Sequence, residues 1–540
     1  MLLDLIVENA AIDTMDPDRP HANSIGILNG YIVGCDEEIS GASATTRIDA
    51  GGRAIIPGII DAHCHTAWFG RTLVEADLSA PSDLAGALTV LRARAEETPP
   101  GDWVVAAGYN QHRFGGAYPT LAELDQLANG RPLVIRQSSG HAAIANTRAL
   151  ELAGILDAPD PVGGAIERDS TGRATGRLEE TAQDLVLNLL KPYSGAEIIS
   201  AIDRATQVYA QQGITSFCEA GIGAGWIGHS PLEIRAYQEA AETGRLHSRA
   251  QLMPTIDNLR ELAGAPGEPG GNGLDLGIRT GFGDDRVRIG PTKVFVDGSL
   301  TGRTCALTEP FCGEEENVGM LQYEEEHVRQ LILDAAEAGW SIAAHAIGDR
   351  AIDLAIDTLT EARRLFGAPR YPHRIEHVSV LRDDQLPRLA AAGIAVTPQA
   401  LFVRQFGDAF ADSLGDRRAA GVYRAQSLLD AGVLVAGSSD RPCIDGNPFE
   451  AMRTLRERRT LSGAVFAPHE QVSAESALAM YTREAARGIG RERSVGMLRR
   501  GLLADLVVLN HSPLAEDPAT LSEIEVLTTI LGGAIVHSTL

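Results

Sequence analysis

The chain has 540 residues, of which 44% are hydrophobic, and its formal net charge is −25. This length predicts one large domain with a smaller one, or two to four domains. The negative charge argues against nucleic acid and membranes as partners, because phosphate backbones and anionic lipid headgroups carry the same sign. From the N-terminus, residues 2–55 are predicted to form short β-strands, because β-rich runs are broken there at Asn-Gly and Gly-Gly.

The middle of the chain, residues 57–494, alternates short apolar runs with helical patterns. This alternation predicts parallel βα units, and their number favours a (β/α)8 barrel over an open sheet. Residues 70–195 depart from the alternation and are interpreted as an insertion after the first barrel strand. The expected strands are 213–221, 287–299, 340–349, 373–381, 393–400 and 432–440, and the expected helices are 196–211, 231–243, 325–338, 350–366, 383–391 and 421–431.

The C-terminal residues return to β-strands, and one of their turns is Gly-Gly. Because both chain ends are β-rich, residues 1–56 and 495–540 are predicted to form one small sheet domain beside the barrel domain. The six cysteines lack the spacing of a disulfide framework, and Met1–Asp16 lack the basic region of a signal peptide. These features predict a cytoplasmic protein.

A His-x-His pair closes the first apolar run of the barrel, in the stretch PGIIDAHCHT. In a strand, residues two apart face the same side, so His63 and His65 are expected to point together while Cys64 points away. Two neutral imidazoles at the carboxyl end of a barrel strand suit a divalent ion such as zinc. Alternatively, they are two polar residues that end a strand.

Three more strand ends carry potential metal ligands, namely His345 after WSIAA, His377 after HRIE and Asp440 after GVLVAGSS. A single histidine of this kind is more often a hydrogen-bonded core residue. Several strand ends that bear histidine or aspartate in the same role are hard to explain in that way. The set predicts a metal site.

Lys293 lies inside the apolar run TKVFVDGS, where a lysine is unfavourable unless it is paired or modified. Strand alternation places it on the same face as Asp297, so one interpretation is an ion pair between the two. The other is that CO2 carbamylates Lys293 and turns it into an anionic ligand that bridges two metal ions.

Five motifs together resemble the signature blocks of the amidohydrolase superfamily and of its amidohydrolase-3 branch, which includes N-substituted formamide deformylase. They are PGIIDAHCHT, KVFVDGSLTGRT, AAHAIGDRAID, RIEHVSVL and AGSSDRPCIDGNPFEAM. The resemblance covers nearly the whole chain and implies a (β/α)8 barrel with a small β-sandwich built from both termini. It also implies metal ligands His63, His65, His345 and His377, a ligand and proton-transfer role for Asp440, and a carbamylated, bridging and catalytic Lys293.

This ligand set predicts a metal-dependent hydrolase of carbon–nitrogen bonds other than peptide bonds. One or two divalent ions, with zinc as the first choice, lower the pKa of bound water from ~16 to ~7, and the resulting hydroxide attacks an amide carbonyl. Asp440 accepts the water proton and returns it to the leaving amine. The expected substrate is an N-substituted formamide or a similar small amide, and a homodimer is an expected assembly.

Four residues are predicted to bind substrate. Trp68 directly follows the His-x-His pair and is either a pocket residue or a core residue. In the resembling branch, the segments that carry Tyr109 and His141 line the pocket. Arg303 lies just beyond Lys293, where it binds a carboxylate or carbonyl or is simply solvated.

Two alternative functions remain open from the sequence. The same ligands serve deamination of a heterocycle or hydrolysis of a cyclic imide, because only the pocket differs. A non-catalytic regulatory protein on an old enzyme scaffold is the other alternative, although such proteins usually lose ligands and here every ligand position is filled.

Overall fold

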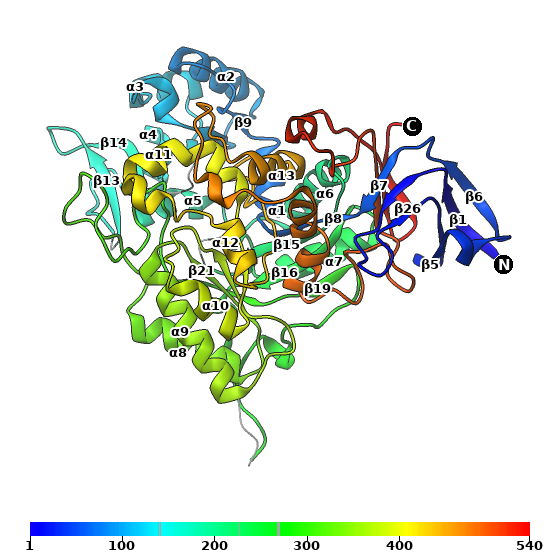
Figure 1. Cartoon of the computed structure of the whole chain (residues 1–540). Coiled ribbons are helices and arrows are strands. Elements are labelled where there is room, and N and C mark those ends of the chain that lie inside the picture. The colour runs from blue at the N-terminus through cyan, green and yellow to red at the C-terminus, as the bar shows by residue number, and fades with distance from the viewer. Residues whose placement is uncertain (139, 141, 162, 226, 267–270) are drawn as a thin grey trace. The chain divides into compact units, whose positions relative to one another are not determined.

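The computed structural model describes residues 1–540 except 139, 141, 162, 226 and 267–270, and it is an α/β protein with mixed sheets (Figure 1). The chain forms two compact units. Unit 1 comprises residues 1–66, 206–228 and 232–540, and unit 2 comprises 67–205 and 229–231.

Two sheets of unit 1 are built from residues near the chain ends. The strand order of the first is β5-β4-β1-β6, and that of the second is β26-β25-β24-β7-β2-β3, so strands of both termini pair directly. In that pairing β24 runs antiparallel to β7, with Val507 opposite Ile56. The strands are β1 Leu2–Glu8, β2 Ala11–Asp13, β3 His21–Ala22, β4 Ile25–Leu28, β5 Tyr31–Cys35, β6 Ser43–Asp49, β7 Ala54–Pro57, β24 Leu506–Leu509, β25 Val526–Leu531 and β26 Ala534–Ser538.

Two predicted turns are confirmed in these sheets. Asn29 and Gly30 join β4 to β5 with φ of 51° and 80°, and Gly532 and Gly533 join β25 to β26 with φ of 55° and 80°. Two successive residues with positive φ are typical of the tight hairpin turn that matches strand twist, and Asn-Gly and Gly-Gly adopt it readily.

The rest of unit 1 contains two parallel four-stranded sheets, in the orders β19-β16-β15-β8 and β20-β21-β22-β23. A parallel bridge from Thr255 to Lys293 joins the two sheets at one side. At the other side, Val396 bridges to Val435 and the Ala62 amide donates to the Gly437 carbonyl. The strands are β8 Ile59–Cys64, β15 Ile214–Ile222, β16 Arg249–Pro254, β19 Val287–Ile289, β20 Thr292–Phe295, β21 Ile342–Ala346, β22 Arg374–His377 and β23 Ala395–Thr397.

Helices follow most of these strands, as the alternation predicts. The helices are α6 Gly195–Gln211, α7 Glu233–Glu242, α8 Glu325–Glu337, α9 Asp349–Phe366, α10 Gln385–Ala392, α11 Ala400–Ala419, α12 Ala425–Asp430, α13 Pro448–Glu457, α14 Ala474–Met480 and α15 Arg483–Gly488. One expected strand is realised only in part, because 432–440 contains the bridge at Val435 but no continuous strand.

Unit 2 has its own sheet, β13-β14-β12-β11-β10-β9, and its own core. Its longest helix is α2, which Asp83 caps by accepting the Gly86 amide. The strands β13 and β14 pair antiparallel as a hairpin. The elements are α1 Thr66–Thr72, β9 Ala76–Asp77, α2 Leu84–Glu97, β10 Val104–Tyr109, α3 Leu121–Ala128, β11 Leu133–Gln137, β12 Ala142–Ala145, α4 Thr147–Ala153, β13 Gly164–Arg168, β14 Ala174–Glu180 and α5 Thr181–Leu187.

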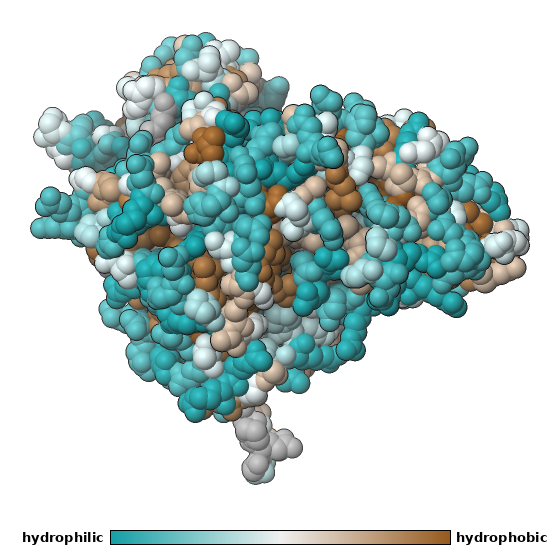
Figure 2. Space-filling model, viewed as in Figure 1, coloured by the Kyte–Doolittle hydropathy of each residue, from teal (hydrophilic) through white to brown (hydrophobic). Residues whose placement is uncertain are grey.

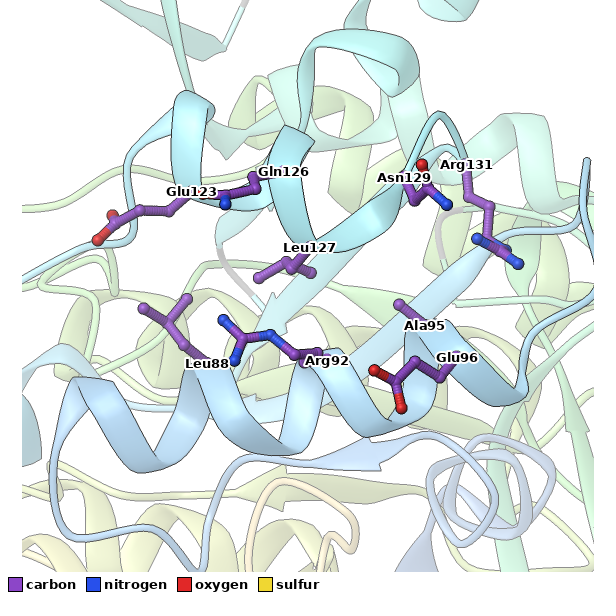
Figure 3. Close-up of a pocket in the computed structure, with 9 residues that line it drawn as sticks. All are labelled: Leu88, Arg92, Ala95, Glu96, Glu123, Gln126, Leu127, Asn129 and Arg131. Carbon is purple, nitrogen blue, oxygen red and sulfur yellow. The ribbon is translucent and has the colours of Figure 1, made fainter.

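A surface groove of about 850 Å³ runs between α2 and α3 (Figure 3). Arg92, Glu96, Glu123 and Arg131 line it with both signs of charge, and none of the predicted site residues is among its lining residues. Figure 2 shows a largely hydrophilic face with scattered apolar side chains. Within the described ranges, no helix has the length and apolar character needed to cross a bilayer.

Candidate metal centre

The His-x-His pair lies at the end of β8, a strand in which all six residues are buried. His63 is 0% exposed and His65 is 5% exposed. Their Nε2 atoms both face one oxygen, Asp440 Oδ1, at 3.3 Å for His63 and 3.0 Å for His65. The two imidazoles therefore point together, as strand alternation predicts.

Asp440 reaches this position from the segment after Val435. Its amide donates to the His63 carbonyl at 2.8 Å, and its φ of 60° lies in the left-handed region. Ligand atoms of His63, His65 and Asp440 all lie within 4.8 Å of one another. The donor set fits zinc, because ligand atoms held tetrahedrally at about 2.0–2.1 Å from zinc lie roughly 3.3 Å apart.

His345 on β21 and His377 on β22 lie beside this group. The His345 and His377 ring centroids are 4.4 Å apart, and the His377 and His63 centroids are 4.9 Å apart. His377 Nδ1 bonds to Gln399 Oε1 at 2.8 Å, and His345 Nε2 bonds to the Gly298 carbonyl at 3.0 Å. Because both partners are acceptors, these nitrogens carry the protons and leave the other ring nitrogens as acceptors.

Burial sets the charge of these imidazoles. It lowers the pKa of His65 to about 4 and that of His377 to about 3, and it holds the pKa of His345 well below the usual value. Burial alone would raise the pKa of Asp440, but its interactions with His63 and His65 outweigh burial and lower it. At neutral pH His65, His345 and His377 are therefore neutral and the Asp440 carboxylate is ionised, which is the state that metal ligands require.

Lys293 on β20 is 1% exposed, and its Nζ has no hydrogen-bond partner among the residues that the structure describes. Burial lowers its pKa to about 8. The alternative ion pair with Asp297 does not form, because that carboxylate accepts the amides of Ala306, Ile347 and Gly348 instead. An amine in this setting is an unusual buried group and remains a candidate for modification.

Glu376 is a site residue that the sequence analysis missed. It is 0% exposed, its Oε2 contacts His63 Nδ1, and Arg374 Nε lies 2.6 Å from its Oε1. Burial alone would raise the pKa of Glu376, but Arg374 and then His63 outweigh burial and lower it. Strand alternation puts Glu376 and His377 on opposite faces, yet the φ of 71° at His377 turns the backbone there, so both residues contact or neighbour His63.

The four predicted substrate residues are placed as follows. Tyr109 is fully buried in a core cluster of unit 2, and its hydroxyl donates to the Ala117 carbonyl at 2.5 Å. Trp68 is partly exposed on α1, and Arg303 forms an ion pair with Glu314 at 2.5 Å. His141 lies outside the described residues. A substrate role for any of them stays a prediction.

Comparison with known families matches residues 46–537 to the Amidohydrolase family. The chain belongs to this family. N-substituted formamide deformylase of Arthrobacter pascens is 31% identical to it over 98% of each chain, and the putative amidohydrolase YtcJ of Bacillus subtilis is 29% identical over 97% of this chain and 98% of its own.

Among solved structures, a metal-dependent hydrolase from Pyrococcus horikoshii superposes with a TM-score of 0.77 over 95% of this chain and 99% of its own, at 23% identity, which shows a shared fold. The resemblance stated from the motifs is confirmed. The protein is an enzyme of the Amidohydrolase family, a metal-dependent hydrolase with a buried His63, His65 and Asp440 group as its candidate metal site.

Proposed function

We propose that this enzyme hydrolyses a carbon–nitrogen bond in small amides, with N-substituted formamides as the first candidates. The observation that carries the proposal is the buried group of His63, His65 and Asp440, whose ligand atoms lie within 4.8 Å of one another. The relative named for formamide deformylation, 31% identical over nearly the full length of both chains, supports this choice of substrate.

The proposed ligands of one or two divalent ions, with zinc as the first choice, are His63, His65, His345, His377, Asp440 and Lys293. Such an ion would supply Lewis acidity, which makes hydroxide available near neutral pH and polarises a carbonyl. An imidazole binds a metal ion while it is neutral, and burial keeps His65 and His377 in that state.

Asp440 is the proposed proton-transfer group. Its carboxylate accepts a proton from the attacking water while the new carbon–oxygen bond forms. It then returns that proton to the nitrogen as the carbon–nitrogen bond breaks, so that the products are an acid and an amine. The interactions that hold Asp440 against His63 and His65 keep it ionised and ready to accept.

Lys293 is the proposed site of carbamylation. Its neutral amine attacks CO2, a nitrogen–carbon bond forms and one proton leaves, which gives an anionic oxygen donor. Burial favours the neutral amine that this reaction needs, since it lowers the pKa of Lys293 to about 8.

For the fold, we propose that the two parallel sheets of unit 1 and the segment at Val435 form the (β/α)8 barrel, and that the two terminal sheets form the β-sandwich. The backbone bonds that join the sheets at both sides support the barrel. The proposed partner is a small amide substrate, and the net charge of −25 disfavours nucleic acid as a partner. The proposed assembly is a homodimer in the cytoplasm.

The test is an activity screen after reconstitution with zinc, manganese or cobalt. Formamides, acyl-amino acids and cyclic amides are compared for acid and amine release, and nucleobase-like compounds for ammonia release. Formate from formamides supports the proposal, and ammonia from heterocycles would replace it with a deaminase. The control pair is Asp440→Asn, expected to lose most of its activity, and Asp445→Asn, expected to keep it. Asp445 is an exposed aspartate that accepts the Asn447 amide.

A further inference from the structure

A chain of buried charges lies behind His63, on the side away from Asp440. Arg374 and Glu376 are two residues apart on β22, and both are 0% exposed. Glu376 contacts His63 Nδ1 through its Oε2 atom. We infer that Glu376 is a positioning residue that fixes the His63 ring with Nε2 aimed at the metal site, an inference that rests on the proposed function.

Glu376 is itself held in place by Arg374 on its own strand and by Thr397 on the neighbouring strand β23. Arg374 Nε lies 2.6 Å from Oε1, and the Thr397 hydroxyl on β23 donates to Oε2 at 2.8 Å. Arg374 also donates through its second terminal nitrogen to the Ala62 carbonyl at 2.8 Å, on the residue before His63. The carboxylate and the backbone of β8 are therefore tied to the same guanidinium, which leaves the His63 ring little freedom to rotate.

The contact also determines which ring nitrogen of His63 carries the proton. A carboxylate paired with Arg374 offers only acceptors, so Nδ1 of His63 is the donor and Nε2 is the ring nitrogen left for a metal ion. That Nε2 atom lies 3.3 Å from Asp440 Oδ1 and has no hydrogen-bond donor within the described part of the chain. Two acceptors facing each other at this distance are stable when a cation lies between them.

Glu376 does not act as a ligand in this arrangement, because Oε2 accepts hydrogen bonds and Oε1 forms an ion pair with Arg374. Oε1 lies 2.6 Å from Arg374 Nε, and Oε2 contacts His63 and accepts hydrogen bonds from Thr397 and from the second terminal nitrogen of Arg374. A carboxylate that accepts the second ring proton of a metal-bound histidine orients the ring and increases its basicity. Loss of such a partner typically lowers metal affinity by about tenfold to a hundredfold.

The test measures zinc affinity of the full chain by competition with a chelator. Glu376→Gln keeps the shape but removes the charge. The matched control is Glu470→Gln, because Glu470 is also 0% exposed and paired with an arginine, Arg424, at 3.2 Å, and it contacts Ser427 rather than a proposed ligand. We expect Glu376→Gln to bind zinc about tenfold to a hundredfold more weakly and Glu470→Gln to bind like wild type.

Thermal unfolding of the metal-free proteins separates positioning from general stability. If Glu376, like Glu470, had only a structural role, both Glu376→Gln and Glu470→Gln would unfold at a lower temperature. Their zinc affinity below that temperature would then equal that of wild type. Equal zinc affinity of folded Glu376→Gln and wild type would overturn the inference, and so would equal weakening in both variants.

If Glu376→Gln does not fold, Thr397→Val removes one hydrogen bond to Glu376 at nearly constant shape. We expect a smaller loss of zinc affinity with normal folding, and unchanged affinity would again overturn the inference. If wild type itself binds no zinc, both the metal site of the proposed function and this inference fail. Zinc binding by wild type that Glu376 does not influence removes the inference alone.

Discussion

A second buried glutamate, Glu219 on β15, gives a prediction about pH and stability. Its Oε2 accepts the Thr66 amide at 2.7 Å and the Tyr237 hydroxyl at 2.5 Å. Burial raises its pKa to about 8, and the nearby Glu233 carboxylate raises it further in the same direction. We expect Glu219→Gln to preserve the fold, because the amide oxygen can accept the same bonds without ionising.

The magnitude follows from the difference between the folded and unfolded pKa. An unfolded glutamate ionises near ~4.3, whereas folded Glu219 keeps its proton up to about pH 8. The stabilisation is therefore fully present below the unfolded pKa and is lost as the pH rises through the folded pKa. At about 1.4 kcal/mol per pH unit, wild type should lose about 4 kcal/mol relative to Glu219→Gln between about pH 5 and about pH 8.

The assay is urea unfolding of the metal-free proteins across this pH range, followed by circular dichroism. Other titrating groups are common to both proteins and cancel in the difference. Glu233→Gln is the second variant, and it should reduce the pH dependence because it removes the neighbouring carboxylate that raises the Glu219 pKa. Parallel stability curves for wild type and Glu219→Gln would refute the reasoning.

Three further changes test the site and the scaffold. Asp440→Asn should lower kcat by about 10²–10⁴-fold on the amide identified by the screen, because proton transfer is lost, and a near-normal kcat would contradict its role. Lys293→Met should abolish the carbamate signal that nuclear magnetic resonance detects after incubation with isotopically labelled bicarbonate, and absence of that signal in wild type would exclude carbamylation. In the wild type, Arg249 pairs with Asp505 at 2.7 and 2.8 Å. Asp505→Asn leaves Arg249 as a buried unpaired charge and should reduce the free energy of unfolding by roughly 3–5 kcal/mol in urea titrations. A loss below about 1 kcal/mol would show that water or another acceptor compensates.

Much of the fold of this protein could be predicted from local sequence patterns. The α/β class follows from apolar runs that alternate with helical periodicity, and the hairpins follow from Asn-Gly and Gly-Gly. The segment 432–440, expected to be a strand, is less regular than predicted. Its extended backbone ends before Asp440, where φ is positive and the chain turns. Side-chain pattern cannot show where a backbone leaves the extended region.

The candidate site could be predicted for residues that end strands on the expected face. His63 and His65 obey strand alternation, and Asp440 joins them through a turn. Glu376 was missed because alternation places it opposite His377, and only the left-handed backbone at His377 brings both residues to His63. Gln399 was missed because a lone glutamine after a short strand carries no metal-ligand signal.

Glu219 and Glu376 show why burial alone does not decide the charge of a carboxylate in this protein. Both are 0% exposed, yet burial and Glu233 raise the pKa of Glu219, whereas Arg374 and His63 lower that of Glu376. The first carboxyl group therefore keeps a proton at neutral pH and forms neutral hydrogen bonds to Thr66 and Tyr237. The second stays an anion, and only an anion can require the proton of His63 to lie on Nδ1 and leave Nε2 for a cation.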